Sequence, residues 1–154
     1  MVAHDSPDTF ALTQAAPSEL SYGRELLDTC GLPTADVTAE MLYIATVDGV
    51  RIGVGGLEQS GSVGLLRSIA IDPAYQGNGY GVALCSEIEQ VAMDAGITQL
   101  FLLTTTAAHF FQQSGYTQID REMAPPVIQQ TTQFSELCPQ QATCLRKQLS
   151  AASE

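Results

Sequence analysis

The sequence predicts an α/β fold: a mixed, mostly antiparallel sheet of about six or seven strands with helices on both faces. Short apolar, β-branched runs alternate with stretches in which apolar residues recur at helical spacing. The early runs follow one another through tight turns, which is typical of an antiparallel meander. The later runs alternate with helical stretches, and that order favours parallel pairing around a helix.

The first half of the chain is predicted to hold a meander and one helix. The Asp48-Gly49 pair indicates a two-residue hairpin of the primed type. Pro17 and Ser18 open the helix, and Gly31 is its expected stop. Strands are expected at residues 9–15, 41–47, 50–58 and 63–71, and the helix at residues 17–30. Pro73 ends the last of these strands because proline cannot donate to the ladder.

The second half is predicted to alternate between helices and strands. Leu84, Ile88, Val91 and Ala92 fall on one helical stripe, and Gly96 caps that helix. Helices are expected at residues 82–95, 107–114 and 125–137, and strands at 99–103, 116–120 and 143–149. The two strands that flank the 82–95 helix should be parallel and joined in a right-handed sense.

Composition narrows the possible partners. The formal net charge is −11, with only six lysines and arginines, so we expect neither nucleic acid nor an anionic membrane as a partner. The chain has no apolar run of about 18 residues, and its first residues lack a basic segment and an apolar core. We therefore expect a cytoplasmic protein with its four cysteines reduced.

The stretch Gln76–Gly81 carries three glycines between a predicted strand and a predicted helix. Glycine lets the backbone approach a ligand closely, and the helix start offers unpaired N–H groups, so the junction suits a phosphate or diphosphate. A tight turn without any ligand is the alternative. A Rossmann site is disfavoured because hairpin-linked strands precede the turn, and the Gly-Lys-Ser/Thr of a Walker A loop is absent.

The pattern Gln-x-x-Gly-x-Gly, formed by Gln76, Gly79 and Gly81, resembles the pyrophosphate loop of the GNAT acetyltransferases. Three further segments resemble that family's cofactor strand, its fifth strand with the following helix, and its Gly-aromatic pair: Leu66–Pro73, Leu100–Phe111 and Gly115-Tyr116. The resemblance covers roughly residues 10 to 149, so we expect residues 1–154 to form one GNAT-type domain with its core at about 10–149.

Two groups within that family are most similar. The segment Leu103–Phe111 resembles the acetyltransferase domain of N-acetylglutamate synthase. More of the chain resembles a group associated with arsenic-resistance operons, through the segments Gly31–Thr34, Gly56–Glu58, Leu65–Ser68 and Phe134–Pro139. Thr106 stands where the synthase has an arginine, which puts glutamate as the acceptor in doubt.

The resemblance implies acetyl-CoA as co-substrate, no metal, a small-molecule primary amine as acceptor and a homodimer. The amine, an amino acid or an analogue that could bear arsenic, attacks the thioester directly. The strand at 63–71 should carry a bulge that splays it from the strand at 99–103, and a backbone N–H near Ile69 should polarise the thioester carbonyl. The implied cofactor-binding residues are Ile69, Ala70, Ile71, Gln76, Gly77, Asn78, Gly79, Tyr80, Gly81, Val82, Thr104 and Phe111.

Two charged residues are candidates for the chemistry. Glu58 could accept the proton that the amine must lose, although a solvated hairpin carboxylate is the competing interpretation. Arg67 interrupts an apolar strand and could clamp an acidic group of the acceptor in a bidentate manner. Its alternative is a structural salt bridge, perhaps with Glu58 itself.

Several residues differ from the family's usual pattern, so the resemblance does not specify every step of the mechanism. Phe111 replaces a tyrosine that reprotonates the thiolate in many family members, and Asn78 replaces a frequent arginine. His109 is expected to be a helix-face histidine rather than a proton shuttle, and Cys138 and Cys144 to be ordinary cysteines rather than ligands of a soft metal or arsenite. A non-catalytic acetyl-CoA sensor or scaffold is the alternative function, and acetylation of peptides is a weaker third one.

Overall fold

A computed structural model describes residues 9–131, 134 and 142–149 of the chain. Its strands are β1 (Phe10–Gln14), β2 (Leu42–Val47), β3 (Val50–Ser60), β4 (Val63–Ile71), β5 (Gln99–Thr104), β6 (Thr117–Ile119) and β7 (Thr143–Gln148). Its α-helices are α1 (Leu20–Thr29), α2 (Tyr80–Asp94), α3 (Ala108–Gln113) and α4 (Pro126–Gln129). Single 3-10 turns lie at Pro17–Glu19, Pro73–Tyr75 and Arg121–Met123.

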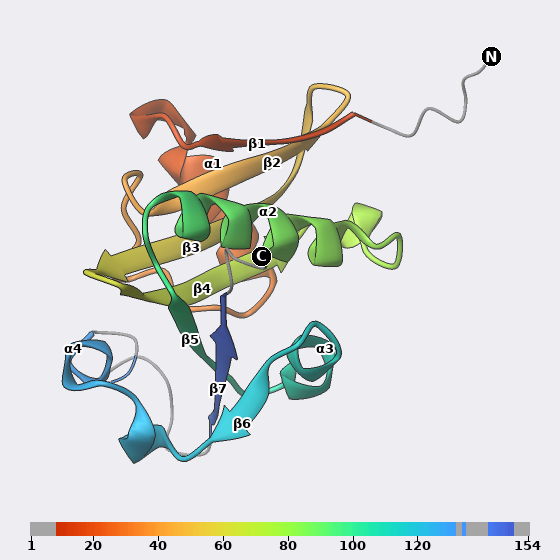
Figure 1. Cartoon of the computed structure of the whole chain (residues 1–154). Coiled ribbons are helices and arrows are strands. Elements are labelled where there is room, and N and C mark those ends of the chain that lie inside the picture. Colours follow the sequence, from red (N-terminus) through yellow and green to blue (C-terminus); the bar gives the residue numbers. More distant parts are fainter. Residues whose placement is uncertain (1–8, 132–133, 135–141, 150–154) are drawn as a thin grey trace. The chain divides into compact units, whose positions relative to one another are not determined.

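The strands hydrogen-bond into one seven-stranded sheet in the order β1-β2-β3-β4-β5-β7-β6 (Figure 1). β4 and β5, which flank α2 in sequence, pair in parallel. β1 with β2, β2 with β3, β5 with β7 and β6 with β7 pair antiparallel. The predicted α/β class with a mixed, mostly antiparallel sheet is therefore confirmed.

The chain divides into two compact units. The first comprises Met1–Gly56 and Ser68–Ile88, and the second comprises Leu57–Arg67 and Glu89–Glu154. Among the described residues, no helix is long and apolar enough to span a membrane.

The first unit is built around the β2–β3 hairpin. Asp48 and Gly49 both have positive φ, 52° and 84°, which is the primed turn that their sequence predicted. On one face, Leu26 and Leu27 of α1 pack in a buried cluster with strand residues such as Leu42. On the other face, the place of a Cβ on Gly55 would lie 2.3 Å from Ile88 of α2, so that glycine allows the helix to approach the strand closely.

The second unit has a separate apolar cluster. β7 lies between β5 and β6 in the sheet (Figure 1). Buried Phe101 of β5, Ile128 of α4, Phe134 and Cys144 of β7 belong to one cluster. The segment around α4 therefore supplies apolar side chains to the core of this unit.

One predicted helix is interrupted. The helix expected over residues 125–137 begins as α4 and stops at Gln129, Gln130 and Thr131 are not helical, and Phe134 is again helical, in a π-type turn. The Thr131 hydroxyl donates to the Ile128 carbonyl (2.7 Å) and accepts the Phe134 N–H (3.3 Å), so side-chain bonding replaces the helical ladder at this point. Residues 132–133 and 135–137 of the predicted helix lie outside the described residues.

Candidate functional site

The turn from β4 into α2 is shaped by its own side chains and glycines. Gln76 Nε2 donates to the Ile71 carbonyl (2.9 Å), and Asn78 Nδ2 donates to the carbonyls of Tyr75 (3.1 Å) and Gln76 (3.3 Å). Gly77 and Gly79 have φ of 84° and 81°, in the left-handed region that favours glycine. No described atom lies within 4 Å of the place a Cβ would take on either residue, so the turn is open on that side.

The helix that follows offers an N-terminus suited to an anion. The N–H of Ala83, in the first turn of α2, donates to the carbonyl of Gly79 in the glycine turn (3.2 Å). The N–H groups just before it lie in the first turn of α2, where a helix has no intrahelical acceptors and its dipole is positive. That first turn carries no carboxylate. The local geometry therefore favours an anion bound by main-chain N–H groups.

The basic side chains of the first unit have partners other than the turn at Gly77–Gly81. The two basic residues of that unit are engaged elsewhere: Arg24 Nη2 donates to the Val37 carbonyl (3.1 Å), and the Arg51 guanidinium stands over the Tyr22 ring (4.4 Å). The side chains flanking the turn are aromatic instead, since Tyr80 stacks on Phe10 with ring centroids 6.3 Å apart. Main-chain N–H groups are therefore what this unit offers to a phosphate at the turn.

The strand before the turn is irregular. Ser68, which has a Cβ, takes φ of 58° within β4. Such a conformation interrupts a regular ladder. The parallel pairing joins only Val63–Leu65 to Gln99–Phe101, although Leu66 and Arg67 continue β4. Both observations fit the bulge and the splay that the resemblance led us to expect.

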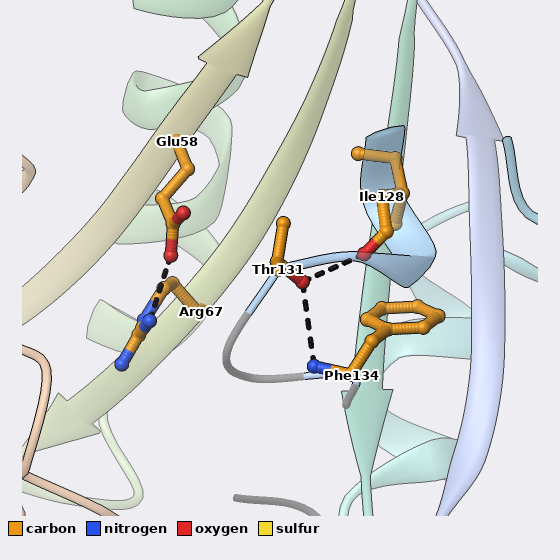
Figure 2. A network of polar contacts seen from close by, with 5 residues as sticks. All are labelled: Glu58, Arg67, Ile128, Thr131 and Phe134. Atoms are coloured by element: carbon orange, nitrogen blue, oxygen red, sulfur yellow. Dashed lines mark hydrogen bonds and ion pairs between the residues drawn. The ribbon is translucent and has the colours of Figure 1, made fainter. Parts of the chain in front are cut away.

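Glu58 and Arg67, the two charged candidates, contact each other (Figure 2). Arg67 Nη1 donates to Glu58 Oε2 at 2.7 Å, from β4 to β3. The side chain of Arg67 is 1% exposed and that of Glu58 is 28% exposed. The salt bridge offered as an alternative for Arg67 is thus present, and the roles of base and clamp stay predictions.

Of the other predicted site residues, Ile69, Ala70, Ile71 and Val82 lie in the first unit, and Thr104 and Phe111 lie in the second. Thr104 Oγ1 accepts the Ala107 N–H (3.0 Å), so this hydroxyl stabilises the turn before α3. Phe111 is buried, and its ring packs edge-on against Phe110 and Tyr116, with centroids 5.0 and 5.7 Å away. His109 is exposed on α3, as expected for a helix-face histidine.

Sequence reasoning missed a buried polar network in this unit. Glu89 of α2 accepts from the Tyr116 hydroxyl (2.9 Å) and from Lys147 Nζ (2.9 Å), and Lys147 also donates to the Ser114 carbonyl (2.9 Å). Tyr116 and Glu89 are both buried. The available signal was the position of Glu89 on the apolar stripe, four residues after Cys85 and three before Ala92.

The structure describes one of the two cysteines considered as possible metal ligands, Cys144. Cys144 is buried on β7, and burial raises the pKa of its thiol to about 11. A thiol held protonated in this way is a poor ligand and a poor nucleophile. Cys138 lies outside the described residues, and among those described there is no cluster of metal-ligating side chains.

Two open hollows lie along α1, and neither is the predicted site. One of about 600 Å³ is lined by residues such as Ser18, Arg24 and Thr34, and one of about 350 Å³ by residues such as Tyr22 and Asp72. No predicted site residue lines either hollow.

The mixed sheet and the open glycine turn at the start of α2 define an α/β protein with a glycine-rich strand-to-helix junction. A model of the acetyltransferase (GNAT) domain matches residues 38–118, more than half of the chain. The chain therefore belongs to the GNAT acetyltransferase family, as its motifs indicated.

Curated relatives match a shorter stretch. The amino-acid acetyltransferases of Salmonella arizonae and of Escherichia coli K12 are 35% and 33% identical over 63 residues, which is 41% of this chain. That stretch is only 14% of either relative, so most of each relative has no counterpart in the match.

Solved structures share the fold over nearly the whole chain. N-acetylglutamate synthase from Neisseria gonorrhoeae, complexed with coenzyme A and L-arginine, superposes with a TM-score of 0.79 at 20% identity. That match covers 94% of this chain and 34% of the synthase chain. Rv2747 from Mycobacterium tuberculosis, in complex with CoA, gives 0.75 at 22% identity and covers 90% of this chain and 99% of its own. At these identities the likeness establishes the fold.

Proposed function

We propose that this chain transfers the acetyl group of acetyl-CoA to the amine of a small molecule, an amino acid or an analogue of one. The observation that carries the proposal is the open glycine turn at Gly77–Gly81, where main-chain N–H groups meet the positive end of α2 with no carboxylate in the first turn. The names of its relatives support the same substrate class, since they are amino-acid acetyltransferases and an N-acetylglutamate synthase solved with coenzyme A.

In this proposal the N–H groups of residues 77–82 bind the diphosphate of acetyl-CoA. The pantetheine arm pairs with the backbone of Ile69–Ile71 as an added strand would. The N–H near Ile69, just after the irregular Ser68, donates to the thioester carbonyl as negative charge develops on its oxygen. Thr104 and Phe111 are the proposed contacts near the thioester end.

The chemical step is direct attack. Glu58 removes a proton from the ammonium group of the acceptor, directly or through a water, and the free amine attacks the thioester carbon. The N–C bond forms, the nitrogen loses its second proton to water, the C–S bond breaks, and coenzyme A leaves as a thiolate. Phe111 has no proton to give, so water protonates the thiolate, which is a stable leaving group at neutral pH.

The finer identity of the acceptor is part of the proposal. An amino acid follows from the relatives, and an arsenic-bearing analogue follows from the resemblance of several segments to the arsenic-resistance group. Thr106 stands where the synthase pattern has an arginine, which disfavours glutamate. A panel that includes glutamate, neutral amino acids and phosphonate or arsonate analogues separates these acceptors.

The test is release of free coenzyme A. Purified protein is incubated with acetyl-CoA and each member of the panel, and the new thiol is measured against protein-free and acceptor-free controls. We expect at least one α-amino acid or analogue to accelerate release and to yield its N-acetyl derivative by mass spectrometry. Silence across the whole panel, with acetyl-CoA bound, would overturn the proposed reaction.

That last result would favour the alternative function, an acetyl-CoA sensor or scaffold. The specific observation behind it is Phe111, a buried phenyl ring at the position where many family members have a proton-donating tyrosine. A sensor binds CoA in a calorimeter without turnover. The expected homodimer also remains a prediction, which light scattering on the purified chain would test.

A further inference from the structure

We infer that Arg67 is a positioning residue that acts through Glu58, rather than a clamp for the acceptor. The inference rests on the proposed function, because it assumes that Glu58 takes the proton of the amine. It starts from the difference in exposure between the two partners. The Arg67 side chain is 1% exposed, whereas the Glu58 side chain is 28% exposed. The carboxylate is therefore the member of the pair that a solute can reach.

The contact fixes one oxygen of the carboxylate. Arg67 Nη1 donates to Glu58 Oε2 at 2.7 Å, at the short end of the usual range for a charge-assisted hydrogen bond. Among the described residues, Glu58 Oε1 has no hydrogen-bond partner. One oxygen is thus held by the guanidinium, and the other is the atom that can accept a proton.

The backbone brings the two residues together. Glu58 and Arg67 lie on consecutive strands, β3 and β4, which are joined by the short turn at Gly61 and Ser62. The planar guanidinium is pre-organised, so it orients a carboxylate better than a flexible ammonium would. An arginine in this position restricts Glu58 to one orientation, which is what a general base requires.

A clamp would demand the opposite arrangement. To bind an acidic group of the acceptor, Arg67 would have to present its guanidinium to solvent or release Glu58. Release would break the 2.7 Å charge-assisted hydrogen bond of a guanidinium that is nearly fully buried, and the loss of such a bond is costly. The salt bridge therefore assigns recognition of the acceptor's acidic group to other residues.

The test is a double-mutant cycle on the full chain, with steady-state kinetics for the best acceptor of the panel. Arg67→Met should lower kcat roughly 10- to 100-fold and leave the KM for the acceptor within about two-fold. Because Arg67 acts through Glu58, adding Arg67→Met to Glu58→Gln should change kcat by less than about two-fold. Arg67→Lys should restore part of the kcat lost in Arg67→Met.

The contradicting results are equally specific. A KM for the acceptor that rises about ten-fold or more in Arg67→Met at preserved kcat shows a clamp. Effects of the two substitutions that multiply in the double variant also overturn the inference. If Arg67→Met does not fold, the same kcat-against-KM criterion applies to Arg67→Lys, which keeps the charge.

A matched control separates positioning from general damage. Arg121 belongs to the same unit and donates to the Phe134 carbonyl (2.6 Å). Arg121→Met should lower the thermal midpoint and leave kcat within about two-fold, and an equal loss of kcat in both variants would contradict the inference. A wild-type chain that acetylates no amine overturns the proposed function as well, whereas an active one with a KM effect overturns this inference alone.

Discussion

The turn at Gly77–Gly81 and the Glu58–Arg67 pair represent two ways of building a polar site. The turn uses backbone conformation: two glycines at positive φ and the start of α2, with no carboxylate in the first helical turn. The pair uses side-chain charge: a buried guanidinium tied to a partly exposed carboxylate. The turn offers N–H groups and no charged group of its own, whereas the pair already contains one positive and one negative side chain.

This difference predicts how each region responds to substitution. A site made of N–H groups is sensitive to backbone shape and insensitive to single charges. A site made of an ion pair is sensitive to the loss of either charge, because the partner is left unsatisfied. Substitutions in the first region should change binding of the cofactor, and those in the second should change the rate of transfer.

The largest effect is expected for Glu58→Gln. The amide cannot accept a proton from the acceptor, so kcat should fall by about 10²- to 10⁴-fold while the dissociation constant of CoA stays within about two-fold. Kinetics checks the fall in kcat, and calorimetry on the same preparation checks the dissociation constant of CoA. Turnover that survives at the wild-type rate would remove Glu58 from the mechanism, and a large loss of CoA binding would contradict the separation of the two regions.

The next effect is expected for Gly79→Ala. A Cβ at a φ of 81° strains the backbone and shifts the neighbouring N–H groups, so CoA affinity should fall about ten-fold with kcat at saturation nearly unchanged. Gly49→Ala is the control, because Gly49 has φ of 84° in the β2–β3 turn and equally open surroundings. The control should cost about 1 kcal/mol of stability. An equal loss of CoA affinity in the control would show that the effect is not local.

A smaller effect is expected for Asn78→Arg. The new cation adds an attraction of about 1 kcal/mol for a diphosphate, partly offset by loss of the two Asn78 side-chain hydrogen bonds. The clearer readout is salt: CoA affinity of the variant should weaken more steeply with ionic strength than that of the wild type. Wild-type binding that is already strongly salt-dependent would mean that side-chain cations contribute to the site.

The smallest effect concerns the buried thiol of Cys144. Its pKa is raised to about 11 from 9.0 by burial, so between these values the unfolded chain ionises while the folded chain keeps the proton. Stability contributed by the thiol is present below pH 9 and is lost as pH rises toward 11. Relative to Cys144→Ala, the wild type should lose roughly 1–2 kcal/mol between about pH 8 and pH 10.5, measured by urea unfolding. The same pH dependence of the free energy of unfolding in both proteins would contradict this effect of burial.

The turn was predictable from the sequence because its cause is local. Glycine at Gly77 and Gly79, and the Asp48-Gly49 pair, specify backbone conformations that few other residues adopt, so spacing along the chain was enough. The ends of α1 and α2 were predictable for the same reason, since Gly31 and Gly96 both take positive φ.

The charged contacts were less predictable because their cause is tertiary. The sequence offered Glu58 and Arg67 as candidates and a salt bridge between them as one alternative, but only the hairpin brings the two side chains to 2.7 Å. The Glu89–Tyr116 bond joins residues 27 positions apart and has no local signature beyond a carboxylate on an apolar stripe. The helix expected at 125–137 is interrupted at Gln130 and Thr131, where the Thr131 hydroxyl competes for the backbone.

The central claim is that main-chain N–H groups at residues 77–82 bind the diphosphate of coenzyme A. The most direct measurement is an amide NMR titration of the ¹⁵N-labelled chain with coenzyme A. We expect the largest shifts at Gly77, Gly79 and Gly81, and much smaller shifts when desulfo-pantetheine without the nucleotide is added. Amides in this turn that do not move while coenzyme A binds elsewhere would contradict the account.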